Sequence, residues 1–142
     1  MLVSQILKDK GDVVFTATPS ETVAAAAALL NARKVGAMVV VDDGQEVVGI
    51  ISERDIIRVV AEKGAEALRL TIADCMSRDV VFADPQETVD SLLGRMTDRR
   101  IRHLPVVRAG RLAGIVSIGD LVKSKIAETV AEAEGLKAYI SA

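Results

Sequence analysis

The sequence predicts a mixed α/β protein built from two copies of a β-α-β-β-α unit. Three observations support this prediction: a tetrapeptide that recurs letter for letter, two pairs of β-branched runs joined by turn residues, and a helix-forming segment on either side of each pair. Each copy has roughly 60 residues and would be marginally stable alone. We therefore expect the sheets of the two copies to pack together around a pseudo-twofold axis.

The repeat extends along the whole chain of 142 residues. The letters Asp-Val-Val-Phe at 12–15 recur at 79–82, and the segment 49–55 aligns with 114–120. The period is thus about 65 to 67 residues, which leaves room for two copies and little else. We assign residues 1–65 to the first repeat and residues 66–142 to the second.

Local signals place the elements of the first copy. Thr22 or Glu21 can cap a helix, and an Asp-Gly pair between two β-branched runs is typical of a hairpin. The predicted elements are a helical lead-in at 3–7, a strand at 13–15, a helix from Glu21 or Thr22 to about Arg33, strands at 37–41 and 46–51, and a helix at about 53–62.

The second copy repeats this order of elements. A connection at 64–70 leads into it. The predicted elements are a lead-in at 72–76, a strand at 80–82, a helix at about 87–99, strands at 103–107 and 112–116, and a helix at about 118–133.

Composition excludes several classes of protein. The chain has 18 basic and 20 acidic residues, a net charge of −2, which argues against binding to nucleic acid or to an acidic membrane. Its single cysteine, Cys75, cannot form an internal disulfide or a multi-cysteine zinc site, and we expect it to be a small buried apolar residue. A signal peptide and a long apolar run are both absent, so we expect a soluble, cytoplasmic protein.

Motifs of catalysis are also missing from the sequence. It contains neither type of glycine-rich phosphate loop, nor the HExxH or GxSxG pattern, nor a cluster of cysteine and histidine. The only histidine, His103, is far in sequence from Cys75. We therefore predict that the chain is not an enzyme and requires no metal.

The strongest chemical signal is the pattern Gly-h-h-Ser-x-x-Asp, where h is apolar, which occurs once in each copy. It places Ser52 and Asp55, and again Ser117 and Asp120, at the start of a helix. Helix N-termini favour anions, and the two carboxylates and hydroxyls could hydrogen-bond the vicinal hydroxyls of a ribose. The alternative is that each Ser-Asp pair is a capping box and binds nothing.

Charge distinguishes the second copy from the first. Between residues 95 and 111 there are six arginines and one acid, Asp98, whereas the equivalent stretch of the first copy is neutral. Arg102 and His103 lie where a helix passes into a buried strand, a place suited to holding phosphate, although surface solvation would also explain them. For Arg95, Arg99, Arg108 and Arg111 a solvated helix face or turn is the simpler interpretation. The six arginines of the whole stretch are Arg95, Arg99, Arg100, Arg102, Arg108 and Arg111.

These motifs resemble those of a tandem cystathionine-β-synthase (CBS) domain pair, also called a Bateman module, over essentially the whole chain. The resemblance is carried by the segments 49–55 and 114–120 together with 34–41 and 100–107. It implies two clefts that bind adenine nucleotides, most often AMP, with ATP, ADP or NAD as other candidates. It also implies a homodimer formed through helices.

The resemblance assigns a set of nucleotide-binding residues by position. In one cleft it groups Ser117 and Asp120, for the ribose, with Asp12, Val14, Gly36 and Ala37; in the other it groups Ser52 and Asp55 with Asp79, Val81, Ile101 and Pro105. Arg54, Arg102 and His103 would address phosphates, and Ile115 completes the set. Gly119 replaces the charged residue found at Arg54, so the two clefts need not be filled equally.

The sequence thus favours a non-catalytic regulatory module that senses cellular energy by binding an adenine nucleotide and signals to a partner protein. The alternative is a dimerisation scaffold whose Ser-Asp pairs are only caps. An enzyme acting on a nucleotide is disfavoured because no base or metal cluster is evident.

Overall fold

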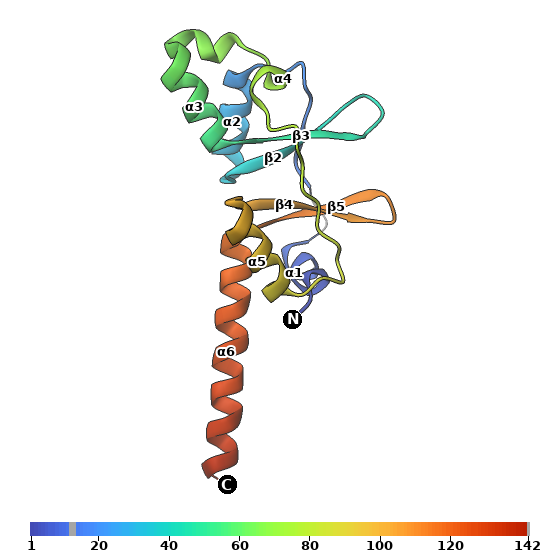
Figure 1. Cartoon of the computed structure of the whole chain (residues 1–142), viewed down its shortest axis with the longest axis vertical. Coiled ribbons are helices and arrows are strands. Elements are labelled where there is room, and N and C mark those ends of the chain that lie inside the picture. Colours follow the sequence, from blue (N-terminus) through green and yellow to red (C-terminus); the bar gives the residue numbers. More distant parts are fainter. Residues whose placement is uncertain (12–13, 142) are drawn as a thin grey trace. The chain divides into compact units, whose positions relative to one another are not determined.

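The protein is described by a computed structural model, in which residues 1–11 and 14–141 are placed (Figure 1). The chain forms two compact units. We call Val14–Val81 the central unit, and Met1–Val13 with Phe82–Ala142 the terminal unit. The N-terminal residues therefore belong to the same compact unit as the part of the second repeat that begins at Phe82. The assignment of residues 1–65 and 66–142 to the two sequence repeats stays a prediction.

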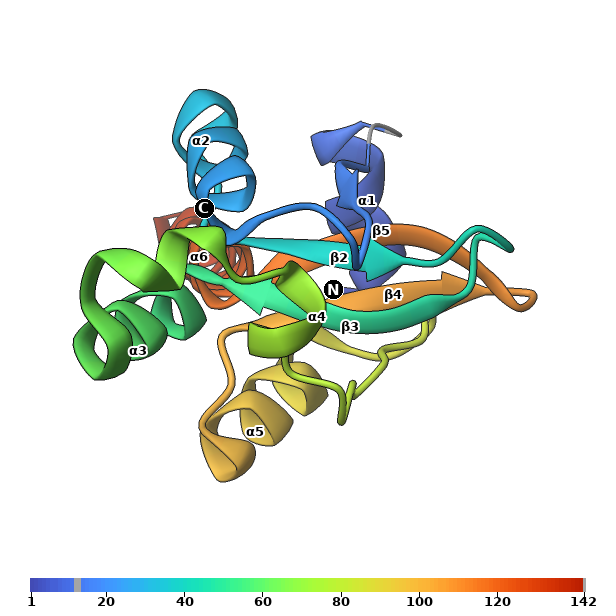
Figure 2. The same cartoon turned by 90° about the horizontal axis from the view of Figure 1, so that it is seen from above.

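The central unit contains a three-stranded sheet in the order β1-β2-β3, with β1 parallel and β3 antiparallel to β2. Helices flank this sheet (Figure 2). The elements are β1 (Thr16–Ala17), α2 (Val23–Arg33), β2 (Ala37–Val41), β3 (Val47–Ser52), α3 (Glu53–Lys63), the 3₁₀ helix η1 (Gly64–Arg69) and α4 (Ile72–Cys75).

Local hydrogen bonds explain where these elements begin and turn. The hydroxyl of Thr22 accepts a 3.1 Å bond from the backbone N–H of Ala25, which caps α2. Asp42 Oδ1 accepts from the N–H groups of Gly44 and Glu46, both at 2.9 Å, and so fixes the turn between β2 and β3. Aliphatic side chains from every element fill the core. The largest fully buried members are Val23, Met38, Val40, Ile51 and Ile72.

In the part of the terminal unit that the structure describes there are one antiparallel hairpin and three helices. Its N-terminal helix is joined to the second repeat by backbone hydrogen bonds of 2.9 Å from Val3 N–H to the carbonyl of Glu87 and 3.0 Å from Val89 N–H to the carbonyl of Met1. The elements are α1 (Val3–Lys10), α5 (Val89–Arg99), β4 (His103–Arg108), β5 (Arg111–Ser117) and α6 (Ile118–Ser141).

The predicted mixed fold, with its four helix-forming segments and two hairpins, is confirmed, and two details are wrong. Val14, Phe15 and 80–82 are not strands; pairing begins further along, at β1 and at an isolated bridge from Ala83 to Val106. Val13, the first residue of the predicted strand, lies outside the described residues. The apolar residues at these positions suggested strands, but only the residues that follow them pair with a neighbouring strand. The last helix also continues to Ser141, well past the predicted end at Ala133.

A glycine in β3 allows a close approach of two backbone segments. A Cβ on Gly49 would lie 2.6 Å from the sulfur of Met76 and 2.9 Å from the carbonyl oxygen of Ser77. At Gly114, its counterpart in β5, a Cβ would meet only the end of the Leu7 side chain, at 2.6 Å. A side-chain end can rotate away, whereas backbone cannot.

We therefore expect Gly49→Ala to lower the free energy of unfolding by about 2–3 kcal/mol, and Gly114→Ala to lower it by about 1 kcal/mol. Urea denaturation of the two variants beside the parent chain measures both. Equal losses would contradict this interpretation of the β3 contact.

Among residues 1–11 and 14–141, no helix is both long enough and apolar enough to cross a membrane.

Candidate ligand-binding site

Both Ser-x-x-Asp motifs lie at the junction of a strand and a helix and form reciprocal caps. In the central unit, Asp55 N–H donates to the Ser52 hydroxyl at 3.3 Å, and Ser52 N–H donates to the carboxylate at 2.9 Å. In the terminal unit the matching distances between Asp120 and Ser117 are 3.1 Å and 2.9 Å. The capping geometry is therefore present twice, and what separates the motifs is the rest of each carboxylate's surroundings.

The carboxylate of Asp55 is buried and fully engaged. Its Oδ2 accepts from the backbone N–H and the hydroxyl of Ser52, and its Oδ1 accepts from Arg58 at 3.1 Å and from the Ser77 hydroxyl at 3.3 Å. Arg58 also donates to the carbonyl of Cys75 at 3.2 Å. Asp55 is only 4% exposed. Since a carboxylate offers about four lone-pair sites, a ligand hydroxyl would have to displace an existing donor.

The carboxylate of Asp120 is more open. Its Oδ2 accepts from Ser117 N–H at 2.9 Å and from Lys10 Nζ at 2.7 Å, and Lys10 also donates to the carbonyl of Ile115 at 2.9 Å. Within the described part of the chain, no donor reaches its Oδ1. The side chain of Asp120 keeps 26% of its surface exposed. A ligand hydroxyl could therefore bind Oδ1 without displacing any bond.

Two opposing effects set the protonation of Asp120. Partial burial raises the pKa of its carboxyl. Hydrogen bonds from Lys10 and Ser117 and the charge of Lys10 lower the pKa by more than burial raises it, so the pKa is below its ordinary value. Asp120 is therefore ionised at neutral pH and can accept hydrogen bonds from a ribose.

Sequence reasoning missed the cation that contacts this site. In the repeat, Lys10 corresponds to Ser77, because 12–15 aligns with 79–82. Ser77 pairs through its backbone with Ile50 and through its hydroxyl with the first aspartate. Lys10 contacts the residues of the second repeat that correspond to these two, Ile115 and Asp120. It does so through its ammonium group, which donates to the Ile115 carbonyl and to the Asp120 carboxylate. Alignment of the two lead-in segments, with attention to charge, would have identified it.

A pocket of about 250 Å³ opens beside Asp120. Two cations, Lys10 and Lys123, and two acids, Asp9 and Asp120, are among its lining residues. Lys123 occupies the repeat position of Arg58, so the second repeat replaces an aspartate-bound guanidinium by an amine on the pocket wall. The remaining lining residues are Met1, Ile6, Ser124 and Ala127.

The other predicted nucleotide-binding residues divide between the units. In the central unit, the start of β2 lies next to the motif: Ala37 pairs with Ser52, and Glu53 N–H donates to the carbonyl of Gly36 at 2.9 Å. Arg54 is exposed. The other members in this unit are Val14, Asp79 and Val81.

The terminal unit has the same arrangement. His103 pairs with Ser117, and Pro105 with Ile115. Ile118 N–H donates to the carbonyl of Arg102 at 2.8 Å, and the Arg102 side chain is exposed. Ile101 precedes β4.

The predicted grouping across repeats is not tested by these contacts. Each predicted set combines residues of the two units, so the grouping stays a prediction. Asp12 lies outside the described residues.

One arginine of the basic stretch has a structural role. Arg95 was expected to be solvated, but it donates to both carboxylate oxygens of Glu87, at 2.8 and 2.9 Å, and to the carbonyl of Phe82 at 2.8 Å. It thus ties α5 to the segment that precedes it and is not available to a ligand.

In the described ranges, no group of three or more His, Cys, Asp or Glu side chains could hold a metal ion. Cys75 is buried as expected, and burial raises the pKa of its thiol. It is therefore protonated at neutral pH.

Two hairpins, each leading into a Ser-x-x-Asp helix start, define a tandem-repeat α/β protein with paired candidate ligand sites. The family model of the CBS domain matches residues 4–62 and 72–126. The chain belongs to the CBS-domain family, as a tandem pair.

Relatives agree with this assignment. The chain is 34% identical to the mitochondrial CBS domain-containing protein CBSX3 of Arabidopsis thaliana, over 97% of this chain and 71% of that protein. The crystal structure of the CBS-domain containing protein ATU1752 from Agrobacterium tumefaciens has a TM-score of 0.85 and 43% identity, covering 87% of this chain and 92% of that one.

A third structure contains ligands. The CBS domain pair of protein MJ0100, in complex with 5′-methylthioadenosine and S-adenosyl-L-methionine, has a TM-score of 0.80 and 29% identity, covering 90% of this chain and 98% of that one. CBS pairs similar to this chain thus include one that binds adenosine-containing ligands.

Proposed function

We propose that this chain is a non-catalytic regulatory module that binds an adenosine-containing ligand, with the Ser117–Asp120 motif of the second repeat as its principal ribose contact. Ligand binding changes the conformation of the module, and a partner protein recognises the change. Such a ligand shifts the equilibrium only by its difference in affinity for the two conformations.

The observation that carries this proposal is the difference between the two aspartates. Asp120 has an oxygen, Oδ1, to which a ribose hydroxyl can donate without competition, while both oxygens of Asp55 are occupied by donors of the protein. Hydrogen bonds to a charged acceptor contribute about 1.5–3 kcal/mol each. We therefore propose that the second repeat binds more tightly than the first.

The ligand class rests on the family and on local charge. The similar CBS pair of MJ0100 binds methylthioadenosine and S-adenosylmethionine, which share an adenosine group with AMP, ADP, ATP and NAD. Exposed Arg102 and Arg54, together with His103, suit a phosphate-bearing member of this class, and AMP is the member we favour. We also propose that the chain forms a homodimer, that it is cytoplasmic, and that it senses cellular energy.

A second candidate function is a dimerisation scaffold. It is supported by the capping geometry, since both Ser-Asp pairs satisfy helix N-termini without any ligand. A scaffold would bind no nucleotide.

Thermal unfolding with a ligand panel separates the two functions. The panel contains AMP, ADP, ATP, NAD, S-adenosylmethionine and methylthioadenosine, with GMP as the control. At a concentration of 100 times Kd, a ligand should stabilise the fold by about 2.7 kcal/mol, a rise of several degrees in Tm. A rise with adenine compounds only supports the sensor. No rise, from protein shown to be free of co-purified nucleotide, supports the scaffold.

A further inference from the structure

The C-terminal half of α6 has no partner among the described residues of its own unit. From Thr129 to Ile140 every residue is exposed, and in Figure 1 this part of the helix extends beyond α1 and α5. The counterpart helix α3 has 11 residues, whereas α6 has 24. The second CBS match ends at residue 126, so the extension lies beyond the domain itself.

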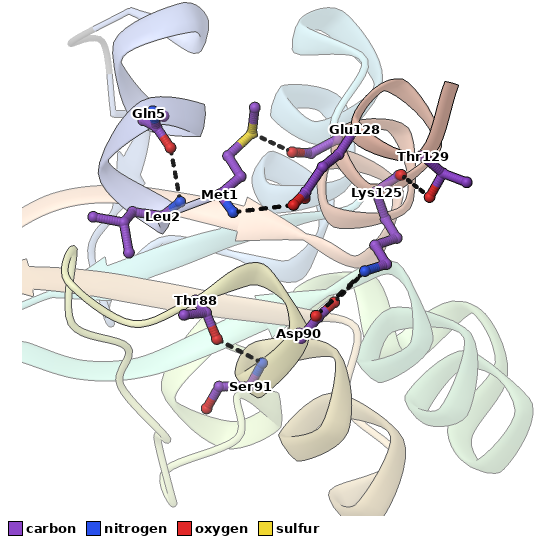
Figure 3. A network of polar contacts seen from close by, with 10 residues as sticks. Met1, Leu2, Gln5, Thr88, Asp90, Ser91, Lys125, Glu128 and Thr129 are labelled. Carbon is purple, nitrogen blue, oxygen red and sulfur yellow. Dashed lines mark hydrogen bonds and ion pairs between the residues drawn. The ribbon is translucent and has the colours of Figure 1, made fainter. Parts of the chain in front are cut away.

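The first half of α6, by contrast, is fixed to its unit (Figure 3). Lys125 makes a 3.0 Å ion pair with Asp90 of α5, and the N-terminal ammonium group of Met1 lies 3.6 Å from Glu128. These contacts hold the base of the helix in place. The exposed half is therefore presented in a defined direction relative to α5 and α1.

Side chains that are apolar, except for Thr129, recur along this helix with a coiled-coil spacing. They alternate at intervals of four and three residues, the a and d positions of a heptad. Ile126 is 60% exposed, Leu136 62% and Ile140 74%, which is more than a helix packed on its own domain would leave in water. The small residues within the stripe permit close approach of a second helix. The stripe consists of Val122, Ile126, Thr129, Ala133, Leu136 and Ile140.

Charges beside the stripe favour a second copy in parallel orientation. One flank carries Lys123, Val130 and Lys137, and the other carries Lys125, Glu132 and Tyr139. In a parallel pair, Glu132 lies beside Lys137 of the other copy, and symmetry repeats this attraction. In an antiparallel pair each flank faces itself, so the flank with two lysines meets no opposite charge.

From these observations we infer that the segment from Ile126 to Ile140 forms a parallel two-stranded coiled coil with the same segment of a second copy. The inference gives a specific surface and orientation to the homodimer proposed above. A membrane surface is the other apolar environment that could cover the stripe, but the glutamates Glu128, Glu132 and Glu134 on the rest of the helix disfavour anionic lipid.

Disulfide trapping tests the geometry directly. In a Cys75→Ala background, Leu136→Cys places the only thiol on the stripe, and Ala138→Cys places it on the opposite side of the same turn. Glutathione disulfide is the oxidant. The parallel coil predicts that Leu136→Cys forms at least about five times more covalent dimer than Ala138→Cys, since only d-position side chains meet their symmetry mates.

A charge exchange tests the orientation independently. We expect Glu132→Lys to weaken dimerisation and Glu132→Lys with Lys137→Glu to restore it, whereas Glu134→Lys, on the outer face, changes nothing. Sedimentation equilibrium of the full chain measures this, with circular dichroism to show that each variant is folded.

Three results would overturn the inference. If the chain sediments as a dimer but Leu136→Cys and Ala138→Cys form equal amounts of covalent dimer, the homodimer is supported and the coiled coil is contradicted. If the chain sediments as a monomer at all concentrations, both the homodimer and the coiled coil are contradicted. Co-sedimentation of the monomer with phosphatidylcholine–phosphatidylserine vesicles, lost in a Leu136→Glu variant, would assign the stripe to lipid.

Discussion

Asp120→Ala should abolish most of the ligand-induced rise in Tm while leaving the unliganded protein almost as stable as before. The substitution removes the ionised acceptor proposed for the ribose hydroxyls. At about 1.5–3 kcal/mol each, loss of two charge-assisted hydrogen bonds corresponds to at least roughly 100-fold weaker binding. The cost in stability should be small, about 1 kcal/mol, because the carboxylate is partly exposed and its main structural role is a helix cap.

Isothermal titration calorimetry with the best ligand of the panel measures this loss. Asp98→Ala is the control, since Asp98 is an exposed acid in the last turn of α5. It should bind as the parent does. Unchanged affinity in Asp120→Ala would contradict the proposed site, and a loss in Asp55→Ala alone would move the site to the first repeat.

Asp55→Ala should instead destabilise the fold. It removes the acceptor of the Ser52 cap and of the bonds from Arg58 and Ser77. We expect a loss of about 3 kcal/mol, of which roughly 1 comes from the cap and the remainder from the charged hydrogen bonds of a buried group. The corresponding fall in Tm is on the order of 10 °C.

Asp74→Ala is the matched control for this experiment. Asp74 forms the same capping box with Thr71 at the start of α4, but it is exposed, and no cation among the described residues bonds to it. Its loss should cost about 1 kcal/mol or less. If urea denaturation gave equal losses for the two variants, burial and the Arg58 contact would not be what stabilises Asp55.

Much of the fold could be predicted from local sequence signals. Thr22 caps the helix that follows it, and the Asp-Gly turn closes the first hairpin, both as the sequence predicts. These signals work because a cap or a tight turn depends on a few neighbouring residues. Residues 14–15 and 80–82 were wrongly predicted as strand because pairing depends on which segment a distant strand reaches.

The site was predicted in part. Repetition identified both Ser-Asp motifs, and the alternative of a capping box proved to describe their geometry. The sequence did not distinguish the two aspartates, because their local motifs are alike. Arg58 follows its aspartate by three residues, but Ser77 and Lys10 come from other parts of the chain.

By itself, then, the sequence determined the tandem CBS pair, its helices and hairpins, and the two motifs, since each depends on residue order within a repeat. Only the tertiary structure decided which carboxylate is saturated, that α1 packs with the second repeat, and that the end of α6 is left exposed. Those features depend on burial and on contacts between segments remote in sequence, such as Lys10 with Asp120. Local patterns carry no information about which remote side chain fills a given hydrogen-bonding position.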